Sequence, residues 1–318
     1  MSATDTLPFG LTAEQIAAFH RDGYIVVEKL FDEADLQPVI AEIDTEVNAR
    51  AEKLVAEGKL SRTFKELRFE RQLAAISRQT DAVALAIWNG TLCGPAFFNL
   101  ICIDKLLDIA ESLCGPELIA SSVYRLRPKV PGHNNSPVPW HQDSGYFEPY
   151  CDKALVLTAW LPLVDATREN GCMWVIPGVH HDENILKHQG RPGKWYLEIP
   201  DAELPPVEPL CVPVPKGGVL LLGNRTPHAS FNNGSDVVRW SMDLRYQSAA
   251  LPTNAKVSRL PGEIKGGAEP HIPVACYPPE ADFLVRSQAR PNEVLRDAAE
   301  FQRLRQHHSY APVTKRWN

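Results

Sequence analysis

The segment that decides the fold, residues 139–147, reads Pro-Trp-His-Gln-Asp-Ser-Gly-Tyr-Phe, with His141 and Asp143 at its centre. Successive side chains of a β-strand alternate between its two faces, so residues two apart project from the same face. An imidazole and a carboxylate placed in this way can take two neighbouring positions on one divalent cation. With a second histidine they would form the 2-His-1-carboxylate triad typical of non-haem Fe(II) oxygenases, which leaves open coordination positions.

The His-x-Asp pattern is short, and this chain contains it three times. The copy at residues 20–22 stands where a helical pattern gives way to a glycine, which favours a solvated helix end. The copy at residues 180–182 follows Pro177-Gly178, a turn signal, and is expected at a surface corner. His141 and Asp143 alone combine aromatic neighbours on both sides with a polar approach loop, residues 133–136, so we expect the metal site there.

Composition narrows the classes of function. The 318 residues permit one large domain, and a net charge of −6 argues against nucleic acid or an anionic membrane surface as a partner. Seven cysteines without a Cys-x-x-Cys pair suggest reduced thiols in a cytoplasmic protein. No apolar run reaches the roughly 18 residues that cross a bilayer, and the first residues lack a secretory signal pattern. The sequence has no linker, internal repeat or low-complexity tract that would divide it, so we expect a single domain spanning 1–318.

The first 117 residues carry mostly helical patterns. Residues 11–22 are expected to form a helix with Thr12 as its N-cap, and residues 23–27 a short strand. A longer helix is expected from about 32 to 57, because its apolar positions keep helical spacing. Further helices are expected over 82–88 and 97–113.

From residue 118 the pattern changes to short apolar runs separated by proline, glycine and asparagine. Several short strands punctuated by turns are typical of a barrel or sandwich. We expect a β-rich core over 118–250, buttressed by the helical residues 1–117 and followed by a C-terminal extension, 251–318, with a closing helix at 292–307. The expected strands are 118–126, 154–163, 172–176, 209–214, 218–223, 228–232 and 237–247.

Asn233-Gly234 stands between two of these runs and is a strong hairpin signal, because both residues tolerate the positive φ of a type I′ turn. A two-residue turn there makes His228 and Arg239 direct cross-strand partners, and such partners project from the same face. The pattern predicts an antiparallel pair, 228–232 with 235–246, that carries the second histidine and an arginine inward. The outward residues are then Val238, Trp240, Met242 and Leu244.

Arg239 suits a specific task, because a guanidinium grips a carboxylate through two parallel hydrogen bonds and stays charged at any working pH. A bidentate oxo acid on a metal ion needs its far carboxylate held in this way. Ser230, two residues after the histidine, adds a hydroxyl. Arg245 is the competing candidate on the same strand face, although an ion pair with Asp243 or Glu169 is expected for it.

These features together resemble the phytanoyl-CoA dioxygenase family of Fe(II)/2-oxoglutarate-dependent oxygenases. The resemblance extends from about residue 12 to residue 247 and includes the run TAWLPLVDATRENG at 158–171. It implies a mainly β fold with flanking α-helices, built on a double-stranded β-helix (jelly-roll, cupin-like) core. The implied metal ligands are His141, Asp143 and His228, and the residues implied around 2-oxoglutarate are Arg239, Ser230 and Trp160.

The resemblance implies an enzyme that needs Fe(II), 2-oxoglutarate and O2. It is expected to hydroxylate an unactivated C–H bond of a small metabolite or natural product and to release succinate and CO2, with no catalytic residue beyond the metal ligands. The carboxylate of Asp143 favours hydroxylation over halogenation, because related halogenases carry a small residue there. Two alternatives are a catalytically silent scaffold and a cupin-like metal-binding isomerase or binding protein that does not use 2-oxoglutarate.

The substrate pocket is less well defined by the sequence. Tyr146, Phe147 and the loop 133–138 are expected to border it, and the insertion 180–205 with the C-terminal segment is expected to form a lid. The basic cluster 62–71 is the only groove candidate for the phosphates of a CoA thioester, so a small polar metabolite is favoured.

Overall fold

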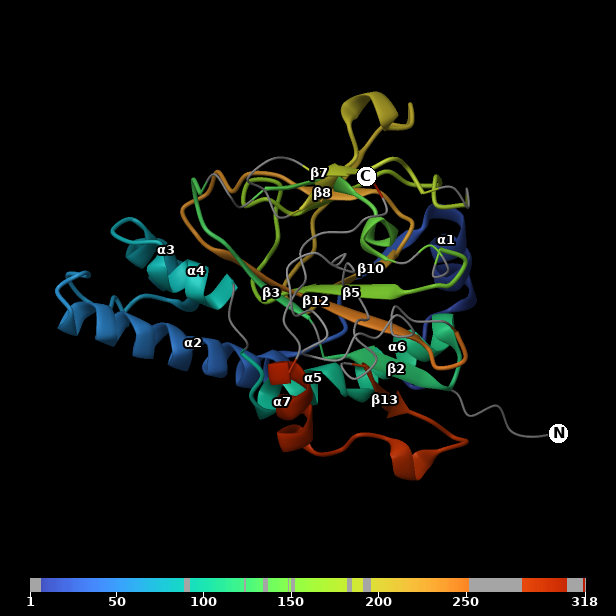
Figure 1. The fold of residues 1–318 in the computed structure, drawn as a ribbon, viewed down its shortest axis with the longest axis horizontal. Helices are drawn as coiled ribbons and strands as arrows, with labels where there is room; N and C mark the ends of the chain where they lie inside the picture. Colours follow the sequence, from blue (N-terminus) through green and yellow to red (C-terminus); the bar gives the residue numbers. More distant parts are fainter. Residues whose placement is uncertain are drawn as a thin grey trace, which may run out of the picture.

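The computed structural model describes residues 7–88, 92–122, 124–133, 137–147, 149, 152–181, 185–190, 196–251, 282–307 and 317. Two antiparallel sheets form its centre. The larger sheet has the strand order β1-β10-β5-β12-β2-β13, with β3 also paired to β12, and the smaller sheet has the order β4-β11-β6-β9. This arrangement confirms the expected mainly β fold with a jelly-roll core and flanking helices (Figure 1).

The strands are short and lie mostly in the second half of the chain. The larger sheet consists of β1 (Tyr24–Val27), β2 (Leu118–Ser121), β3 (Arg125–Lys129), β5 (Leu157–Pro162), β10 (Val219–Gly223), β12 (Arg239–Ser248) and β13 (Asp282–Arg286). The smaller sheet consists of β4 (Val138–His141), β6 (Met173–Val175), β9 (Leu210–Val212) and β11 (His228–Ser230). Two further strands, β7 (Gln189–Gly190) and β8 (Leu197–Glu198), form a separate pair.

Helices cover one side of the larger sheet, and Figure 1 shows α5, α6 and α7 gathered below β5 and β12. The first helix begins at the predicted cap, because Thr12 and Gln15 each accept a hydrogen bond from the other's backbone N–H, at 3.2 and 2.9 Å. The helices are α1 (Ala13–Asp22), α2 (Glu33–Ala56), α3 (Phe69–Ser77), α4 (Ala82–Trp88), α5 (Pro95–Ile101), α6 (Asp104–Cys114) and α7 (Ala298–His307).

Alternation along the central strands divides the apolar residues between two cores. In β10, Val219 and Leu221 belong to the cluster shared with the helices, whereas Leu220 and Leu222 belong to a second cluster with residues of the smaller sheet. Because successive side chains of a strand point to opposite faces, a strand covered on both sides needs apolar residues at every position. Trp160 of β5 lies on the second, inter-sheet side.

The predicted hairpin at Asn233-Gly234 is wrong. The strand β11 pairs with β4 and β6 in the smaller sheet, whereas β12 pairs with β2, β3 and β5 in the larger one. Both edges of each strand are therefore already hydrogen-bonded. Neither Asn233 nor Gly234 has the positive φ of a type I′ turn. The Asn233 amide instead donates to the carbonyls of Lys129 and Val237, at 2.7 Å each, in a loop that crosses between the sheets.

The predicted directions of the β12 side chains are nevertheless correct. Trp240 is fully buried and stacks on Phe69 of α3, with 5.1 Å between the ring centroids. Arg239 and Ser241 hydrogen-bond to each other on the opposite, inward face. The outward residues packed in the cluster with the helices are Val238, Trp240, Met242 and Leu244. Alternation sets these directions whichever strand lies alongside.

The remaining expectations have mixed outcomes. The run expected at 118–126 is divided into β2 and β3, and α3 begins inside the basic cluster 62–71. The larger sheet is not confined to residues 118–250, because it includes β1 from the N-terminal part and β13 from the C-terminal extension. Most of the expected lid, including 182–184, 191–195 and 252–281, lies outside the described residues. No helix in the described ranges is both long and apolar enough to cross a bilayer.

Candidate functional site

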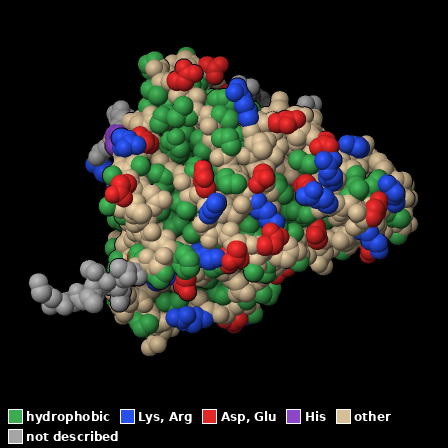
Figure 2. All heavy atoms as spheres, turned by 180° about the vertical axis from the view of Figure 1, so that it is seen from behind, with side chains coloured by type: hydrophobic (Ala, Val, Ile, Leu, Met, Phe, Trp, Pro, Cys, Tyr) green, Lys and Arg blue, Asp and Glu red, His purple; other side chains and the backbone are tan. Residues whose placement is uncertain are grey.

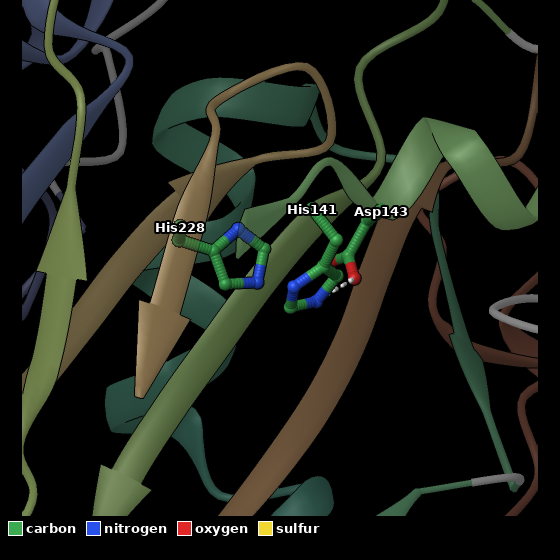
Figure 3. Close-up of side chains that lie close together, drawn as sticks. All are labelled: His141, Asp143 and His228. Carbon is green, nitrogen blue, oxygen red and sulfur yellow. Dashed lines mark ion pairs between the residues drawn. The ribbon is translucent and has the colours of Figure 1, made fainter. Parts of the chain in front are cut away.

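Three buried side chains converge between the two sheets, where His141 and His228 point toward one another and Asp143 lies beside His141 (Figure 3). Ligand atoms of the three residues all lie within 4.8 Å of one another. His141 is the last residue of β4 and His228 the first of β11, and the two are register partners across these strands. The pairing of β11 with β4 therefore brings the second histidine to the first.

Asp143 reaches the site by a different route from the one expected. The strand β4 ends at His141, and Asp143 begins a short 3-10 helix, Asp143–Tyr146. His141 and Asp143 therefore do not project from one face of a single strand, as the sequence had suggested. The chain turns directly after His141, and this turn presents the carboxylate, whose Oδ1 lies 4.0 Å from the His141 Nε2.

The hydrogen bonds of both histidines leave one ring nitrogen available to a metal. The Nδ1 of His141 lies 2.8 Å from the Pro139 carbonyl, and the Nδ1 of His228 lies 2.9 Å from the Thr226 carbonyl. A carbonyl only accepts, so Nδ1 carries the proton in each neutral ring and Nε2 presents its lone pair. Burial, with His228 nearby, lowers the pKa of His141, which keeps the ring neutral. This donor set fits a divalent transition-metal ion.

Asp143 is held by a hydroxyl and a guanidinium. Thr158 donates to its Oδ2 at 2.6 Å, and the Arg245 Nη2 lies 3.1 Å from each carboxylate oxygen. Burial opposes the charge of the carboxylate, but the nearby Arg245 guanidinium and the hydrogen bond from Thr158 hold the pKa of Asp143 well below its usual range. Arg245 and Thr158 are themselves cross-strand partners in β12 and β5, so both reach the same carboxylate.

The ion pair expected for Arg245, with Asp243 or Glu169, is therefore wrong. Asp243 pairs instead with Arg127 of β3, whose Nε lies 2.5 Å from its Oδ2. The expectation considered only β12 and its near neighbours in sequence. Arg127 lies on β3 and Thr158 on β5, and both of these strands pair with β12 although they are remote from it along the chain. Contacts with these strands, and not sequence neighbours, therefore set the partners of Asp243 and Arg245.

Arg239 lies in the same cavity and is 1% exposed. Its guanidinium donates to the hydroxyls of Ser241 and Ser230, the latter at 3.2 Å, and lies 5.1 Å from the centre of the Trp160 ring. Burial lowers its pKa to about 10, so it remains charged at neutral pH. Within the described residues no carboxylate lies within 4.0 Å of it, and its Nε has no hydrogen-bond partner.

One cavity joins these groups. The residues that line it are Arg127, Val138, His141, Asp143, Thr158, Trp160, Met173, Leu222, His228, Ser230, Arg239, Asp243 and Arg245. The arrangement can hold a metal ion at one end and an anionic group at Arg239, with Trp160 as a flat wall beside the guanidinium. Its donor set and its buried, unpaired cation fit a chelating oxo acid whose second carboxylate is anchored away from the metal.

The residues expected around the pocket take different places. The Tyr146 ring packs edge-on against the His141 ring, with 5.9 Å between centroids. Phe147 packs with Val156 in a separate small cluster. Val138 lines the cavity, and residues 134–136 of the same loop lie outside the described ranges.

Three residues close to the site carried no expectation: Thr158, Arg127 and Lys129. Arg127 and Lys129 alternate along β3, and they face the inward residues Ser241 and Arg239 of β12. The alternation of basic residues in the sequence Arg-Leu-Arg-Pro-Lys at 125–129 was the available signal, since basic residues on one face of a strand need partners.

Comparisons with known proteins agree with this geometry. Human peroxisomal phytanoyl-CoA dioxygenase is 24% identical over 246 residues, which cover 75% of this chain and 69% of that protein. The zebrafish (Danio rerio) phytanoyl-CoA dioxygenase domain-containing protein 1 is 34% identical over 154 residues, which cover 46% of this chain and 50% of that protein.

Solved structures share the fold. The non-heme monooxygenase ThoJ in its apo form superposes with a TM-score of 0.53 at 21% identity, covering 76% of this chain and 80% of that one. EctD from S. alaskensis, with 2-oxoglutarate and 5-hydroxyectoine, superposes with a TM-score of 0.52 at 22% identity, covering 87% and 91%.

The sequence pattern of the family described as Phytanoyl-CoA dioxygenase (PhyH) matches residues 19–241, which include all three residues of the triad and Arg239. The match spans more than half of the chain, from within α1 to within β12. The chain therefore belongs to the phytanoyl-CoA dioxygenase family.

Proposed function

We propose that this protein is an Fe(II)- and 2-oxoglutarate-dependent dioxygenase that hydroxylates a small molecule. The observation that carries the proposal is the buried Arg239 guanidinium, which shares a cavity with the triad and has no carboxylate within 4.0 Å among the described residues. A buried charge without a counter-ion is costly. An oxo acid chelated at the triad would supply the missing anion, whereas a metal-dependent isomerase would leave Arg239 without a purpose.

In this proposal His141, Asp143 and His228 hold the iron, and Arg239 with Ser230 and Trp160 holds the far carboxylate of 2-oxoglutarate. When bound together, iron and 2-oxoglutarate use O2 to oxidise a C–H bond, with release of succinate and CO2. The chain supplies geometry and electrostatics. Proton donation from each Nδ1 to a backbone carbonyl fixes both imidazole rings, and Thr158 with Arg245 fixes the carboxylate.

A small-molecule substrate and a cytoplasmic location are parts of the same proposal. The EctD structure that shares the fold is described with 5-hydroxyectoine, a small molecule. Positive and negative side chains are interspersed over the face shown in Figure 2, and the net charge is −6, which argues against a nucleic-acid partner. The five cysteines of the described ranges are free thiols, which supports a reducing compartment.

The test is succinate formation from 2-oxoglutarate by the purified protein, with Fe(II) and O2 omitted in turn. We expect slow turnover without added substrate and none when either is omitted. His141→Ala should abolish it, because the triad loses one nitrogen ligand. His20→Ala is the matched control, since His20 belongs to another His-x-Asp pattern on the exposed end of α1. Equal rates for His141→Ala and the wild type would contradict the assignment of the metal site.

A further inference from the structure

Two charged residues of the cavity have no part in the proposed iron and 2-oxoglutarate sites. Arg127 projects from β3 and Asp243 from β12, and both line the cavity that contains the triad. The Arg127 Nε donates to the Asp243 Oδ2 at 2.5 Å, and the Trp88 ring lies 5.5 Å from the guanidinium. Buried ion pairs contribute little net stability after desolvation, so stability alone does not explain this pair.

Asp243 has an unused oxygen. Its side chain is 8% exposed, and its Oδ1 has no hydrogen-bond partner among the described residues. A buried carboxylate oxygen without a donor is costly and calls for an explanation. Because Asp243 lines the cavity, a ligand that carries a hydroxyl or amino group can supply the missing donor.

The charges of the cavity wall do not balance. Its described lining has three guanidinium groups, on Arg127, Arg239 and Arg245, against two carboxylates, on Asp143 and Asp243. In the proposed loaded state, the two positive charges of Fe(II) and the two negative charges of 2-oxoglutarate cancel. One positive charge remains in a site of low dielectric, where an uncompensated charge is unfavourable. A substrate with one negative charge neutralises it.

We propose that Arg127 and Asp243 select the substrate of this oxygenase, and that the substrate is a small carboxylic acid with a hydroxyl or amino group close to its carboxylate. The inference rests on the proposed function and narrows its substrate class. Arg127 binds the carboxylate of the substrate, while Asp243 accepts the hydrogen bond from its hydroxyl or amino group. The carbon skeleton then lies against the apolar part of the wall, formed by Val138, Met173 and Leu222.

The experiment compares matched compounds on the wild-type enzyme loaded with Fe(II) and 2-oxoglutarate. The probes are a panel of small hydroxy and amino acids, each beside its primary amide and beside the acid that lacks the hydroxyl or amino group. Two readouts are used: succinate release above the substrate-free rate, and perturbation of the anaerobic visible spectrum. We expect acids to act at concentrations about 30-fold or more below those of their amides, because the amide carries no negative charge to offset the excess positive charge of the cavity lining.

Variants assign the selectivity to the pair. Arg127→Gln should remove the preference for acids over amides, and Arg127→Lys should restore part of it. Asp243→Asn should reduce the preference for hydroxy and amino acids over the plain acids. Arg71→Gln is the matched control, because Arg71 forms an ion pair of the same 2.5 Å length with Asp236 on the surface. Thermal unfolding of each variant confirms that it folds, and the comparison of wild-type acids and amides does not depend on any variant.

Each contrary result has a distinct meaning. A panel in which no acid acts, or in which the amides act as well as the acids, would overturn the substrate inference while leaving the oxygenase intact. If Arg127→Gln weakened 2-oxoglutarate binding without changing the preference for acids over amides, Arg127 would be assigned to the co-substrate. A wild-type protein that neither binds nor consumes 2-oxoglutarate would instead refute the proposed function itself.

Discussion

The Arg245 guanidinium lies 3.1 Å from the carboxylate of Asp143, so the acidic residue of the triad has its own counter-ion. Thr158 holds the same carboxylate from the neighbouring strand. Removal of a group that orients a metal ligand typically lowers metal affinity or activity by about 10- to 100-fold. Arg245 is thus a positioning residue for the metal site.

Arg245→Gln should weaken Fe(II) binding by about 10- to 100-fold, because the Asp143 carboxylate loses one of the two groups that orient it. Anaerobic calorimetry with Fe(II) measures the dissociation constant directly. Arg245→Lys keeps the charge and should recover part of the affinity. Arg50→Gln, which breaks a surface ion pair within α2, is the control and should bind Fe(II) like the wild type. Unchanged affinity in Arg245→Gln would show that Thr158 alone orients the carboxylate.

Arg239→Ala should raise the dissociation constant of 2-oxoglutarate while sparing metal binding. Leaving a buried carboxylate without its charged partner costs about 2–5 kcal/mol, or roughly 30-fold to several thousand-fold in affinity. Titration of 2-oxoglutarate at saturating Fe(II) under anaerobic conditions separates the two effects. If Arg245→Ala weakened 2-oxoglutarate binding and Arg239→Ala did not, the carboxylate anchor would be Arg245.

The two faces of β12 should respond in opposite ways to substitution. Trp240→Ala should lower the free energy of unfolding by about 3–5 kcal/mol, because it removes a fully buried ring that stacks on Phe69. Ser241→Ala should change stability much less and should weaken 2-oxoglutarate binding, since Ser241 hydrogen-bonds to Arg239. Urea unfolding and 2-oxoglutarate titration of both variants check this crossed pattern. Equal effects on both quantities would argue against the assigned faces.

Lys129 should make the stability of the fold depend on pH. Burial, with Arg239 and Arg127 nearby, lowers its pKa from the ordinary 10.5 to about 6. Between these values the unfolded chain binds one more proton than the folded one, so the free energy of unfolding rises with pH, by up to about 1.4 kcal/mol per unit. Below pH 6 the penalty for burying the charge is fully present.

Lys129→Met removes this titration, so its unfolding free energy should rise less steeply than that of the wild type between pH 7 and pH 9. Urea unfolding at several pH values measures the two slopes. Lys59→Met removes an exposed lysine and should keep the wild-type slope. Parallel curves for Lys129→Met and the wild type would mean that Lys129 stays protonated in the fold.

The parts of the structure that depend on local pattern could be predicted from the sequence. Alternation along β12 correctly placed Trp240 on the outer face and Arg239 on the inner face, because the direction of a side chain depends only on its position in the strand. The helix cap at Thr12 is similarly local. The grouping of His141, Asp143 and His228 was expected from residue types, spacing and the family resemblance, and the structure brings the three together.

The contacts between distant segments could not be predicted in this way. The hairpin expected for His228 and Arg239 failed because β11 and β12 each use both edges with strands far away in the sequence. The partner of Arg245 is Asp143, which its cross-strand neighbour Thr158 also contacts. The residues near 245 in the sequence do not reveal that Thr158 lies beside Arg245. Both histidine and arginine still reach one cavity, because the two sheets face each other across it.

The measurement that tests the central claim most directly is an anaerobic titration with Fe(II) followed by 2-oxoglutarate, observed by visible absorption. If the triad holds iron and Arg239 anchors the oxo acid, the second addition should produce the weak charge-transfer band of a bidentate chelate, and Arg239→Ala should require far more 2-oxoglutarate to produce it. A protein that binds Fe(II) but shows no band at any 2-oxoglutarate concentration would contradict the oxygenase assignment and leave a metal-binding protein of another kind.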